Sequence, residues 1–154
     1  MFRTIVTEYS GMIAKVCYMY ATDASHRQDL SQDTMVNIWR GLDTFRGDSQ
    51  LSTWVYRTCI NTCISSLRKE KFHRNTVTTD IIPDIEGDND DKTARLKEMY
   101  RLISTLNPMD KALIMMWLDE LPYEEIAKVS GMSRNNVATR LRRIKQHLVE
   151  MSNE

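Results

Sequence analysis

The side chains best suited to bind another molecule gather near the C-terminal end of the chain. Within residues 134–148, polar and basic side chains recur at a spacing that places them on one face of a helix: Asn135, Thr139, Arg142, Arg143 and Gln146. Four apolar side chains fall on the opposite face: Val137, Leu141, Ile144 and Leu148. Amide, hydroxyl and guanidinium groups hydrogen-bond base edges and phosphates. The pattern therefore predicts an amphipathic helix whose polar face has the chemical groups to bind nucleic acid.

The distribution of charge favours the same interpretation. The chain carries 21 basic and 21 acidic residues, so its formal net charge is zero and by itself predicts no partner. Between Ile126 and Val149, however, no acidic residue occurs and six basic ones do: Lys128, Arg134, Arg140, Arg142, Arg143 and Lys145. Local positive charge of this kind suits a phosphate backbone. Taken alone, however, the helix is better interpreted as an amphipathic helix with a solvated basic face.

Two short helices joined by a tight turn are predicted to position this face. The first begins at Leu121-Pro122, with Glu124 and Glu125 in its first turn, where the helix dipole favours acidic groups. Gly131 ends this helix, and Ser133 caps a second helix that runs to the C-terminus. This arrangement is the helix-turn-helix, whose second helix enters the major groove of DNA. The segment therefore predicts DNA binding.

A second polar set occurs in the helix predicted from Ser52 to Lys71. One arc of this helix is mainly apolar: Val55, Tyr56, Cys59, Thr62, Cys63 and Leu67. The remaining arc is polar but includes a tryptophan: Trp54, Arg57, Thr58, Asn61, Ser65 and Arg68. A tryptophan among polar side chains suits stacking on unpaired bases, and it suits packing against a neighbouring loop equally well. The sequence leaves both interpretations of Trp54 open.

The three cysteines are Cys17, Cys59 and Cys63, an odd number with no C-x-x-C pair. Cys59 and Cys63 are four residues apart and would share a helix face. We interpret all three as small, buried, reduced thiols of a cytosolic protein rather than as a metal or redox site. No metal site and no cofactor is expected.

The rest of the chain predicts an all-α protein of two small helical domains joined by an acidic linker. Apolar periodicity predicts a helix over 2–20, and a capping box of Ser25 and Gln28 predicts the start of a second. A loop over 45–50 precedes the helix at Ser52. Residues 80–91 hold six acidic residues and no basic one, so we place a first domain at 1–75, the linker at 76–92 and a second domain at 93–154.

The second domain is predicted to begin with a helix through residues 96–106. Asn107 followed by Pro108 is an N-cap with proline at the first helical position, which predicts the start of the next helix. Arg3, Glu8 and Lys15 interrupt the apolar runs near the N-terminus, and no stretch is long and apolar enough for a bilayer. We therefore expect no signal peptide, no membrane insertion and a cytoplasmic location.

Two segments together resemble a known family. Residues 29–71 (DLSQDTMVNIWRGLDTFRGDSQLSTWVYRTCINTCISSLRKEK) and 102–144 (LISTLNPMDKALIMMWLDELPYEEIAKVSGMSRNNVATRLRRI) are similar to the two conserved domains of bacterial sigma-70 family factors, particularly the extracytoplasmic-function (ECF) group. The segments occur in the family's order. The resemblance implies a transcription initiation factor that binds core RNA polymerase and directs it to promoters, recognising the −10 and −35 elements and opening the DNA.

The resemblance also implies partners and site residues. The partners are the β′ clamp helices and the β flap of core polymerase, promoter DNA and an anti-sigma factor. The polymerase-binding residues are Asp29, Gln32, Asp33, Asn37 and Trp39, of which Trp39 is also expected in the core. The −10 residues are Phe45, Arg46, Trp54, Arg57, Thr58, Asn61, Ser65, Arg68 and Lys69. The −35 residues are Arg134, Asn135, Asn136, Thr139, Arg140, Arg142, Arg143 and Gln146.

The chain departs from the family pattern at two places. Housekeeping members carry two adjacent tryptophans where this chain has Trp54-Val55, which implies weak intrinsic melting and a stricter demand on promoter sequence. Ala138 stands where relatives often have a longer polar side chain, which leaves the −35 sequence open. The basic residues at Arg68, Lys69 and 71–74 are expected along the phosphate backbone. The acidic linker is interpreted as a solvated tether or as an imitation of RNA charge in the polymerase channel.

Two other functions are compatible with a helix-turn-helix. One is a stand-alone DNA-binding regulator, which would need no polymerase-docking residues such as Asp29, Gln32 and Asp33. The other is a nucleic-acid enzyme such as a recombinase, which would need clustered carboxylates or an activated nucleophile. The acidic residues here lie mainly in the linker or on the docking helix. We therefore do not expect an enzyme.

Overall fold

The computed structural model describes residues 1–70 and 91–154, and every regular element in these ranges is a helix. In chain order they are α1 (Phe2–Tyr20), α2 (Ala24–Gly41), the short 3-10 helix η1 (Leu42–Thr44), α3 (Leu51–Glu70), α4 (Asp91–Ser104), α5 (Pro108–Leu118), α6 (Tyr123–Ser130) and α7 (Arg134–Ser152). The all-α prediction is confirmed. Residues 76–90 of the predicted linker lie outside the described residues. The last two residues of that linker, 91 and 92, are the first two residues of α4.

Local sequence signals place most helix ends. The Asn107 side chain accepts from the Asp110 amide, and Pro108 is the first residue of α5. The Ser133 hydroxyl accepts a hydrogen bond from the backbone amide of Asn136 and so caps α7. Gly131 ends α6 in the left-handed conformation, with φ of 75°, which a residue without Cβ adopts most easily. These three predictions are confirmed.

The start of α2 differs from the prediction. The Asp23 carboxylate, rather than the Ser25 hydroxyl, accepts from the backbone amide of His26 at 2.7 Å. Aspartate is as good an N-cap as serine. Because Asp23 comes first along the chain, it captures the free amide and the helix begins before the predicted capping box of Ser25 and Gln28. The capping-box prediction is therefore wrong.

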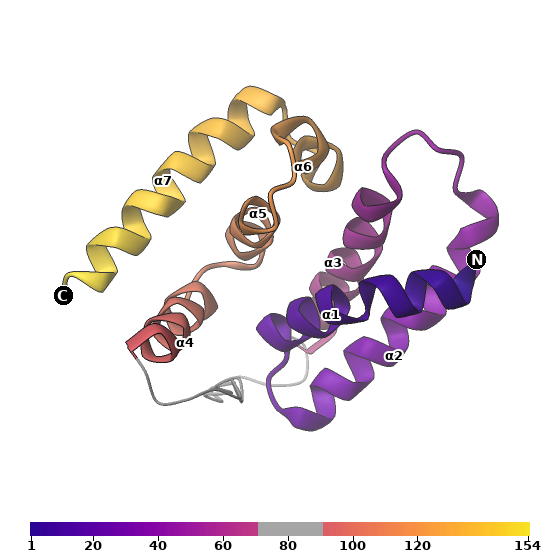
Figure 1. The fold of residues 1–154 in the computed structure, drawn as a ribbon, viewed down its shortest axis with the longest axis horizontal. Helices are drawn as coiled ribbons and strands as arrows, with labels where there is room; N and C mark the ends of the chain where they lie inside the picture. Colours follow the sequence, from indigo (N-terminus) through magenta and orange to yellow (C-terminus); the bar gives the residue numbers. More distant parts are fainter. Residues whose placement is uncertain (71–90) are drawn as a thin grey trace.

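The first three long helices form an N-terminal bundle in which each packs against the other two (Figure 1). Their core includes Ile13 of α1, Leu30 and Ile38 of α2, and Val55 of α3, each exposed by 1% or less. The predicted apolar arc of α3 faces this core, since Tyr56, like Val55, is buried there. The bundle leaves the opposite faces of α2 and α3 free to carry polar residues.

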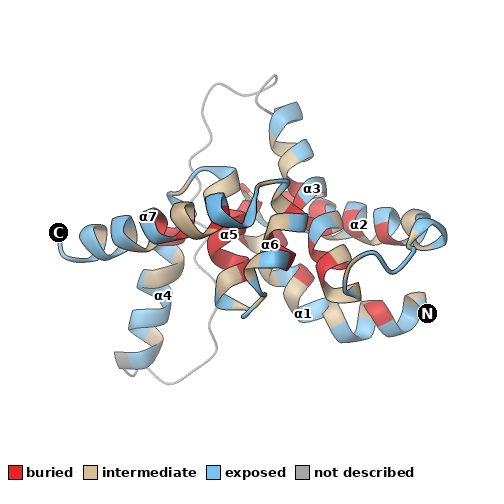
Figure 2. Ribbon diagram, turned by 90° about the horizontal axis from the view of Figure 1, so that it is seen from above, coloured by how far each residue is buried: buried red, intermediate tan, exposed pale blue. Residues whose placement is uncertain are grey.

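The C-terminal half is built around α5, which contacts α4, α6 and α7. Six consecutive residues of α5, Lys111–Met116, are buried, so this helix is covered on all sides (Figure 2). One of the covering elements is α1 of the N-terminal bundle, and α3 packs against α6. The buried side chains of both halves consequently form one continuous hydrophobic cluster.

Polar contacts hold the two halves together around α1. The Tyr20 hydroxyl donates to the Pro108 carbonyl at 2.6 Å, and burial raises the pKa of this phenol well above its usual range. Lys15 pairs with Asp119 at 2.6 Å. The Lys111 ammonium donates to the carbonyl of Met19, the residue before Tyr20, at 3.1 Å. All three contacts join residues close to a hundred positions apart, so they fix the arrangement of the halves.

Candidate nucleic-acid interfaces

The helix-turn-helix has the amphipathic second helix that the sequence predicts. Val137, Leu141 and Ile144 of α7 are buried, and Leu148 is half-buried. Most of the predicted −35 residues on the opposite face are exposed: Arg134, Asn135, Asn136, Arg142, Arg143 and Gln146. The polar face of α7 is therefore open to a duplex.

The basic residues of this segment divide into two groups. Four have partners inside the chain: Lys128 with Glu125 at 3.3 Å, Arg134 with Glu124 at 2.7 Å, Arg140 with Asp110 at 2.7 Å, and Lys145 over the Trp117 ring at 4.3 Å. Arg142 and Arg143 are exposed. The positive charge open to a phosphate is therefore narrower than the sequence suggests, and it centres on Arg142 and Arg143.

Arg140 and Arg134 occupy different settings within the first group. Arg140 is half-buried, and its guanidinium joins α7 to Asp110 at the start of α5. Arg134 is exposed and lies 5.7 Å from the Tyr123 ring centroid. The backbone amide of Glu124 and the Arg134 guanidinium together lower the pKa of the Glu124 carboxyl. Arg140 thus supports the position of the helix, whereas Arg134 is held only in an exposed surface pair, which contributes little to stability.

A polar groove between α2 and α3 brings together residues from two of the predicted sets. It encloses about 650 Å³. Its lining residues are Asp33, Val36, Asn37, Arg40, Thr58, Asn61, Thr62, Ser65, Ser66 and Lys69. Asp33 and Asn37 were predicted to bind polymerase, and Thr58, Asn61, Ser65 and Lys69 to bind the −10 element. Amides, hydroxyls and an ammonium around one hollow suit an unpaired base and its phosphate.

The groove also contains residues that sequence reasoning missed. Arg40, Thr62 and Ser66 line it, although Thr62 was assigned to the apolar arc. The Asn37 amide donates to the Thr62 hydroxyl at 2.8 Å and so ties α2 to α3. The position of Thr62 at the border between the apolar and polar arcs of α3 could have indicated this, because a threonine hydroxyl at such a border can line a polar surface while its methyl group packs on the apolar side.

Trp54 lies one helical turn before Thr58, which lines the groove, and it packs against the preceding loop. Its ring centroid is 5.5 Å from that of Phe45, with the planes tilted by 50°, and both side chains are half-buried. Gly41 makes room for it, because a Cβ at this glycine would lie 2.9 Å from the Trp54 Cζ2 atom. The ring thus packs locally while part of it stays exposed. The other −10 residues Arg46, Arg57, Arg68 and Lys69 are exposed, and residues 71–74 lie outside the described part of the chain.

The predicted polymerase-binding face of α2 is exposed at Asp29, Gln32 and Asp33. The expectation that Trp39 belongs to the core is wrong. Its neighbour Ile38 is fully buried, and one step along a helix rotates Trp39 by about 100° away from that core. Trp39 is 63% exposed, and its ring makes a T-shaped contact with the Phe2 ring at 5.1 Å between centroids. It is an exposed aromatic side chain of α2, and its contact with polymerase stays a prediction.

Comparison with known proteins identifies the family. A model described as Sigma-70 region 2 matches residues 5–73, and one described as Sigma-70, region 4 matches residues 96–148. The chain belongs to the sigma-70 family. Its curated relatives include the ECF RNA polymerase sigma-E factor of Escherichia coli strain K12, which is 28% identical over 94% of this chain and 83% of its own length. The RNA polymerase sigma-H factor of Pseudomonas aeruginosa is 29% identical over 94% of the chain and 82% of its length.

Solved structures agree with this assignment at the level of the fold. The sigma factor RpoE of Bartonella quintana, in complex with the anti-sigma factor NepR, superposes with a TM-score of 0.80 at 19% identity, over 99% of this chain and 96% of its own. CnrH in complex with the cytosolic domain of CnrY superposes with a TM-score of 0.71 at 19% identity, over 99% of this chain and 87% of its own.

This sigma factor of the ECF group is accordingly a transcription initiation factor that directs RNA polymerase to promoters. Within the described residues, no helix has the length and apolarity that a bilayer crossing requires.

Proposed function

We propose that this sigma factor divides its task among three surfaces. The exposed face of α2 docks on the β′ clamp helices, the groove between α2 and α3 receives the −10 element, and the polar face of α7 reads the −35 element. The observation that carries this proposal is the groove, because Asp33 and Asn37 line it from one helix while Asn61 and Ser65 line it from the other. Docking and base capture would therefore occur on adjoining surfaces.

For the −10 element, the proposal rests on the chemistry of the groove. The exposed Asn61 amide can donate to and accept from the edge of a flipped base, and Thr58 and Ser65 supply hydroxyls one helical turn to either side. Lys69 adds positive charge at one end. Phe45 and Trp54 form an aromatic pair next to this hollow, so a base leaving the duplex can stack there.

For the −35 element, Asn135, Thr139 and Gln146 would contact base edges while Arg142 and Arg143 meet phosphates.

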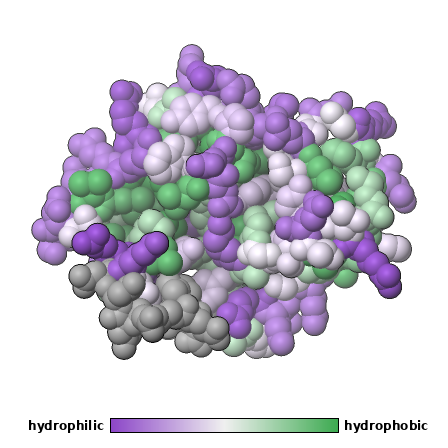
Figure 3. Space-filling view, viewed as in Figure 1, coloured by the Kyte–Doolittle hydropathy of each residue, from purple (hydrophilic) through white to green (hydrophobic). Residues whose placement is uncertain are grey.

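A separate apolar groove of about 780 Å³ lies between α4, α5 and α7, and the corresponding side of the molecule carries a patch of hydrophobic surface (Figure 3). Its lining includes Met99, Trp117, Leu148 and Val149. We assign this groove to the β flap, because an amphipathic polymerase segment would bury the patch there.

We further propose the domain limits 1–75 and 93–154, which the two matched ranges support. An anti-sigma factor is proposed as a third partner. The superpositions cover 99% of this chain, so both halves together resemble proteins solved with such factors. A cytoplasmic location follows from the polymerase as partner. The polymerase carries out the chemistry, and this chain is not proposed to be an enzyme.

The docking assignment is tested by competition for core polymerase. Asp29→Arg combined with Gln32→Ala reverses charge and removes an amide on the exposed face of α2, so it should weaken core binding without loss of helicity. The matched control is Glu8→Arg, an equal charge reversal on the exposed side of α1. A double variant that competes as well as the control variant would refute the assignment. If the wild type itself failed to bind core polymerase, a stand-alone helix-turn-helix regulator would be the better function.

A further inference from the structure

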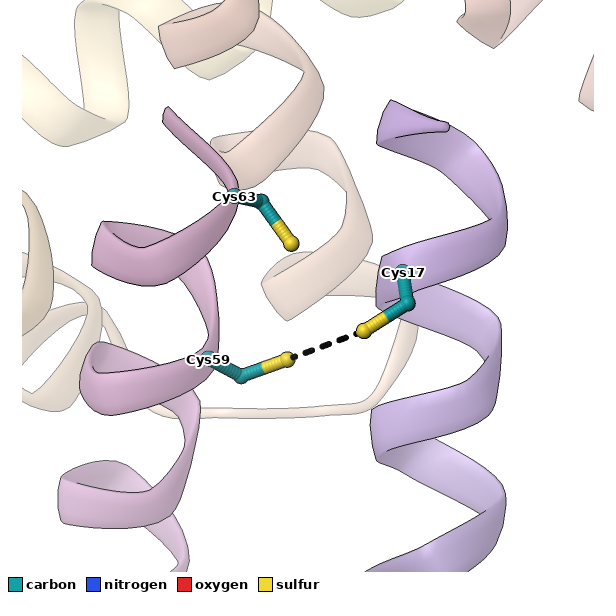
Figure 4. Close-up of side chains that lie close together, drawn as sticks. All are labelled: Cys17, Cys59 and Cys63. Carbon is teal, nitrogen blue, oxygen red and sulfur yellow. Dashed lines mark hydrogen bonds between the residues drawn. The ribbon is translucent and has the colours of Figure 1, made fainter. Parts of the chain in front are cut away.

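The three cysteines of the chain meet at one place in the interior. Cys17 comes from α1, and Cys59 and Cys63 come from successive turns of α3 (Figure 4). Their Sγ atoms all lie within 4.8 Å of one another, and all three side chains are 0% exposed. In the described part of the chain, no other set of three histidine, cysteine or acidic side chains is close enough to share an ion. The sequence predicted burial, which is confirmed, but not this convergence.

We propose that the three sulfurs form a trigonal binding site for Cu(I). Thiolate sulfur is a soft ligand that selects Cu(I) and Zn(II) over hard cations such as Mg²⁺ or Ca²⁺. A metal about 2.3 Å from each of three sulfurs in one plane places those sulfurs about 4 Å apart. The Sγ atoms of Cys17 and Cys59 are already 4.0 Å apart. The wider pair needs to close by less than about 1 Å, which a small rotation about χ1 within one rotamer well provides.

The surroundings favour Cu(I) over Zn(II). Structural zinc is almost always four-coordinate and takes sulfur, imidazole or carboxylate as its ligands. No described histidine or carboxylate joins the three sulfurs. The neighbouring polar side chains are hydroxyls: Thr34 Oγ1 lies 3.9 Å from the Sγ atoms of both Cys17 and Cys59, and Ser31 also hydrogen-bonds Cys17. Three sulfurs without a good fourth ligand match a three-coordinate ion.

Binding of a metal to the resting cluster would exchange protons for the cation. Cu(I) would form three Cu–S bonds, the S–H bonds of the cysteines would break, and their protons would be released to solvent, with no change in the oxidation state of copper or sulfur.

A compensating positive charge comes from the other half of the molecule. Lys111 of α5 is buried, lies 5.2 Å from the Tyr20 ring centroid and donates to the Met19 carbonyl. Burial lowers the pKa of Lys111, while negative charge on Cys63 acts in the opposite direction. A copper site with three thiolates is more negative than the resting cluster. Metal binding would therefore strengthen the attraction between α3 and α5 and stabilise the packed arrangement of the two halves.

The test is a Cu(I) titration of the full-length, reduced protein without oxygen, in competition with a chromophoric Cu(I) chelator and with a phosphine as reductant. We expect uptake of one equivalent, thiolate-to-copper charge-transfer absorption and a higher melting temperature. Cys63→Ala removes a ligand, so its affinity for Cu(I) should fall by at least roughly 10- to 100-fold, the loss caused by removing a group that only hydrogen-bonds a metal ligand. The double variant Cys59→Ala with Cys63→Ala should show no charge-transfer band. Ile5→Val is the matched control, because it trims another buried side chain of α1, three turns away from Cys17, and keeps all three sulfurs, and it should bind as the wild type does.

Copper X-ray absorption of the wild-type complex provides a measurement that needs no variant to fold. Three sulfur neighbours at one distance would support the site. The proposal is overturned if the wild type fails to take copper from the chelator. It is also overturned if the double variant binds as tightly, which would mean adventitious binding at the ten methionines. Nitrogen or oxygen neighbours around copper, or tighter binding of Zn(II) than of Cu(I), would overturn it too.

Discussion

Replacement of Trp54 by alanine distinguishes the two roles that the sequence leaves open for this ring, stacking on an unpaired base and packing against a neighbouring loop. The ring packs against Phe45 at 5.5 Å and over Gly41, but it is only half-buried. Truncation of a fully buried tryptophan costs about 3–5 kcal/mol, so we expect about half of that, near 2 kcal/mol, and a folded variant. Loss of stacking on an unpaired base removes a further 1–3 kcal/mol, roughly, from the open complex. The expected result is roughly a 5- to 150-fold decrease in open-complex formation on duplex promoters.

The assay compares a duplex promoter with the same promoter carrying a pre-melted bubble. Trp54→Ala should be largely rescued by the bubble, because the bases are already unpaired. Asn61→Ala should stay defective on both templates, because the groove between α2 and α3 must still capture the base. Asn153→Ala, an equal change at an exposed asparagine near the C-terminus, is the matched control and should behave as the wild type on both.

Three results would refute this reasoning. Unfolding of the N-terminal bundle by Trp54→Ala, seen by circular dichroism, would assign the ring to the core alone. Trp54→Leu keeps apolar packing against Phe45 but removes the stacking face. If that variant opened promoters normally, stacking would not be the role of the ring. Equal rescue of Trp54→Ala and Asn61→Ala by the bubble would remove the division between opening and base capture.

The helix-turn-helix gives further predictions for four variants, three in α7 and one in the turn before it. Arg140→Ala breaks the half-buried pair with Asp110 and should lower the free energy of unfolding in a urea titration by up to about 1 kcal/mol, whereas Arg143→Ala should leave it unchanged. Arg143→Ala should instead weaken binding to all promoters and reduce the salt slope by about one unit, and an unchanged slope would exclude a phosphate contact. Thr139→Ala should shift base preference at the −35 element, so identical selectivity would count against base reading by α7. Gly131→Ala, at φ of 75°, should cost about 1–2 kcal/mol in unfolding free energy, and no loss would contradict a left-handed cap.

The elements of the helix-turn-helix could be predicted because their signals are local. Gly131 and Ser133 fix the turn through backbone conformation and a single side-chain bond, and Val137 and Leu141 repeat at helical spacing. The α2 start was less predictable, since Asp23 and Ser25 are both good caps and only the folded chain decides between them. Trp39 shows the same limit, because its large apolar ring suggests burial whereas the helix rotation places it outside.

Contacts between distant residues could not be read from local patterns. Residues Lys111–Met116 of α5 are all buried, so this helix shows no alternation of polar and apolar faces. Its sequence therefore could not predict which helices pack against which side of it. The partner of Arg140 is 30 residues away, and Cys17 is 42 residues from Cys59. The groove between α2 and α3 likewise depends on how two helices pack. Sequence patterns predicted polar residues on α2 and on α3 separately. That these residues line one groove follows only from the packing of the two helices in the tertiary structure.

The central claim is that this chain selects promoters for RNA polymerase through both of its halves. The most direct measurement is the sequencing of transcripts made on fragmented genomic DNA by core polymerase with and without the purified protein. We predict discrete new start sites that share one −10 and one −35 sequence at a constant spacing. These starts should be lost with Asn61→Ala and redistributed with Thr139→Ala. Transcripts that are the same with and without the protein, or new starts that share neither element, would contradict the account.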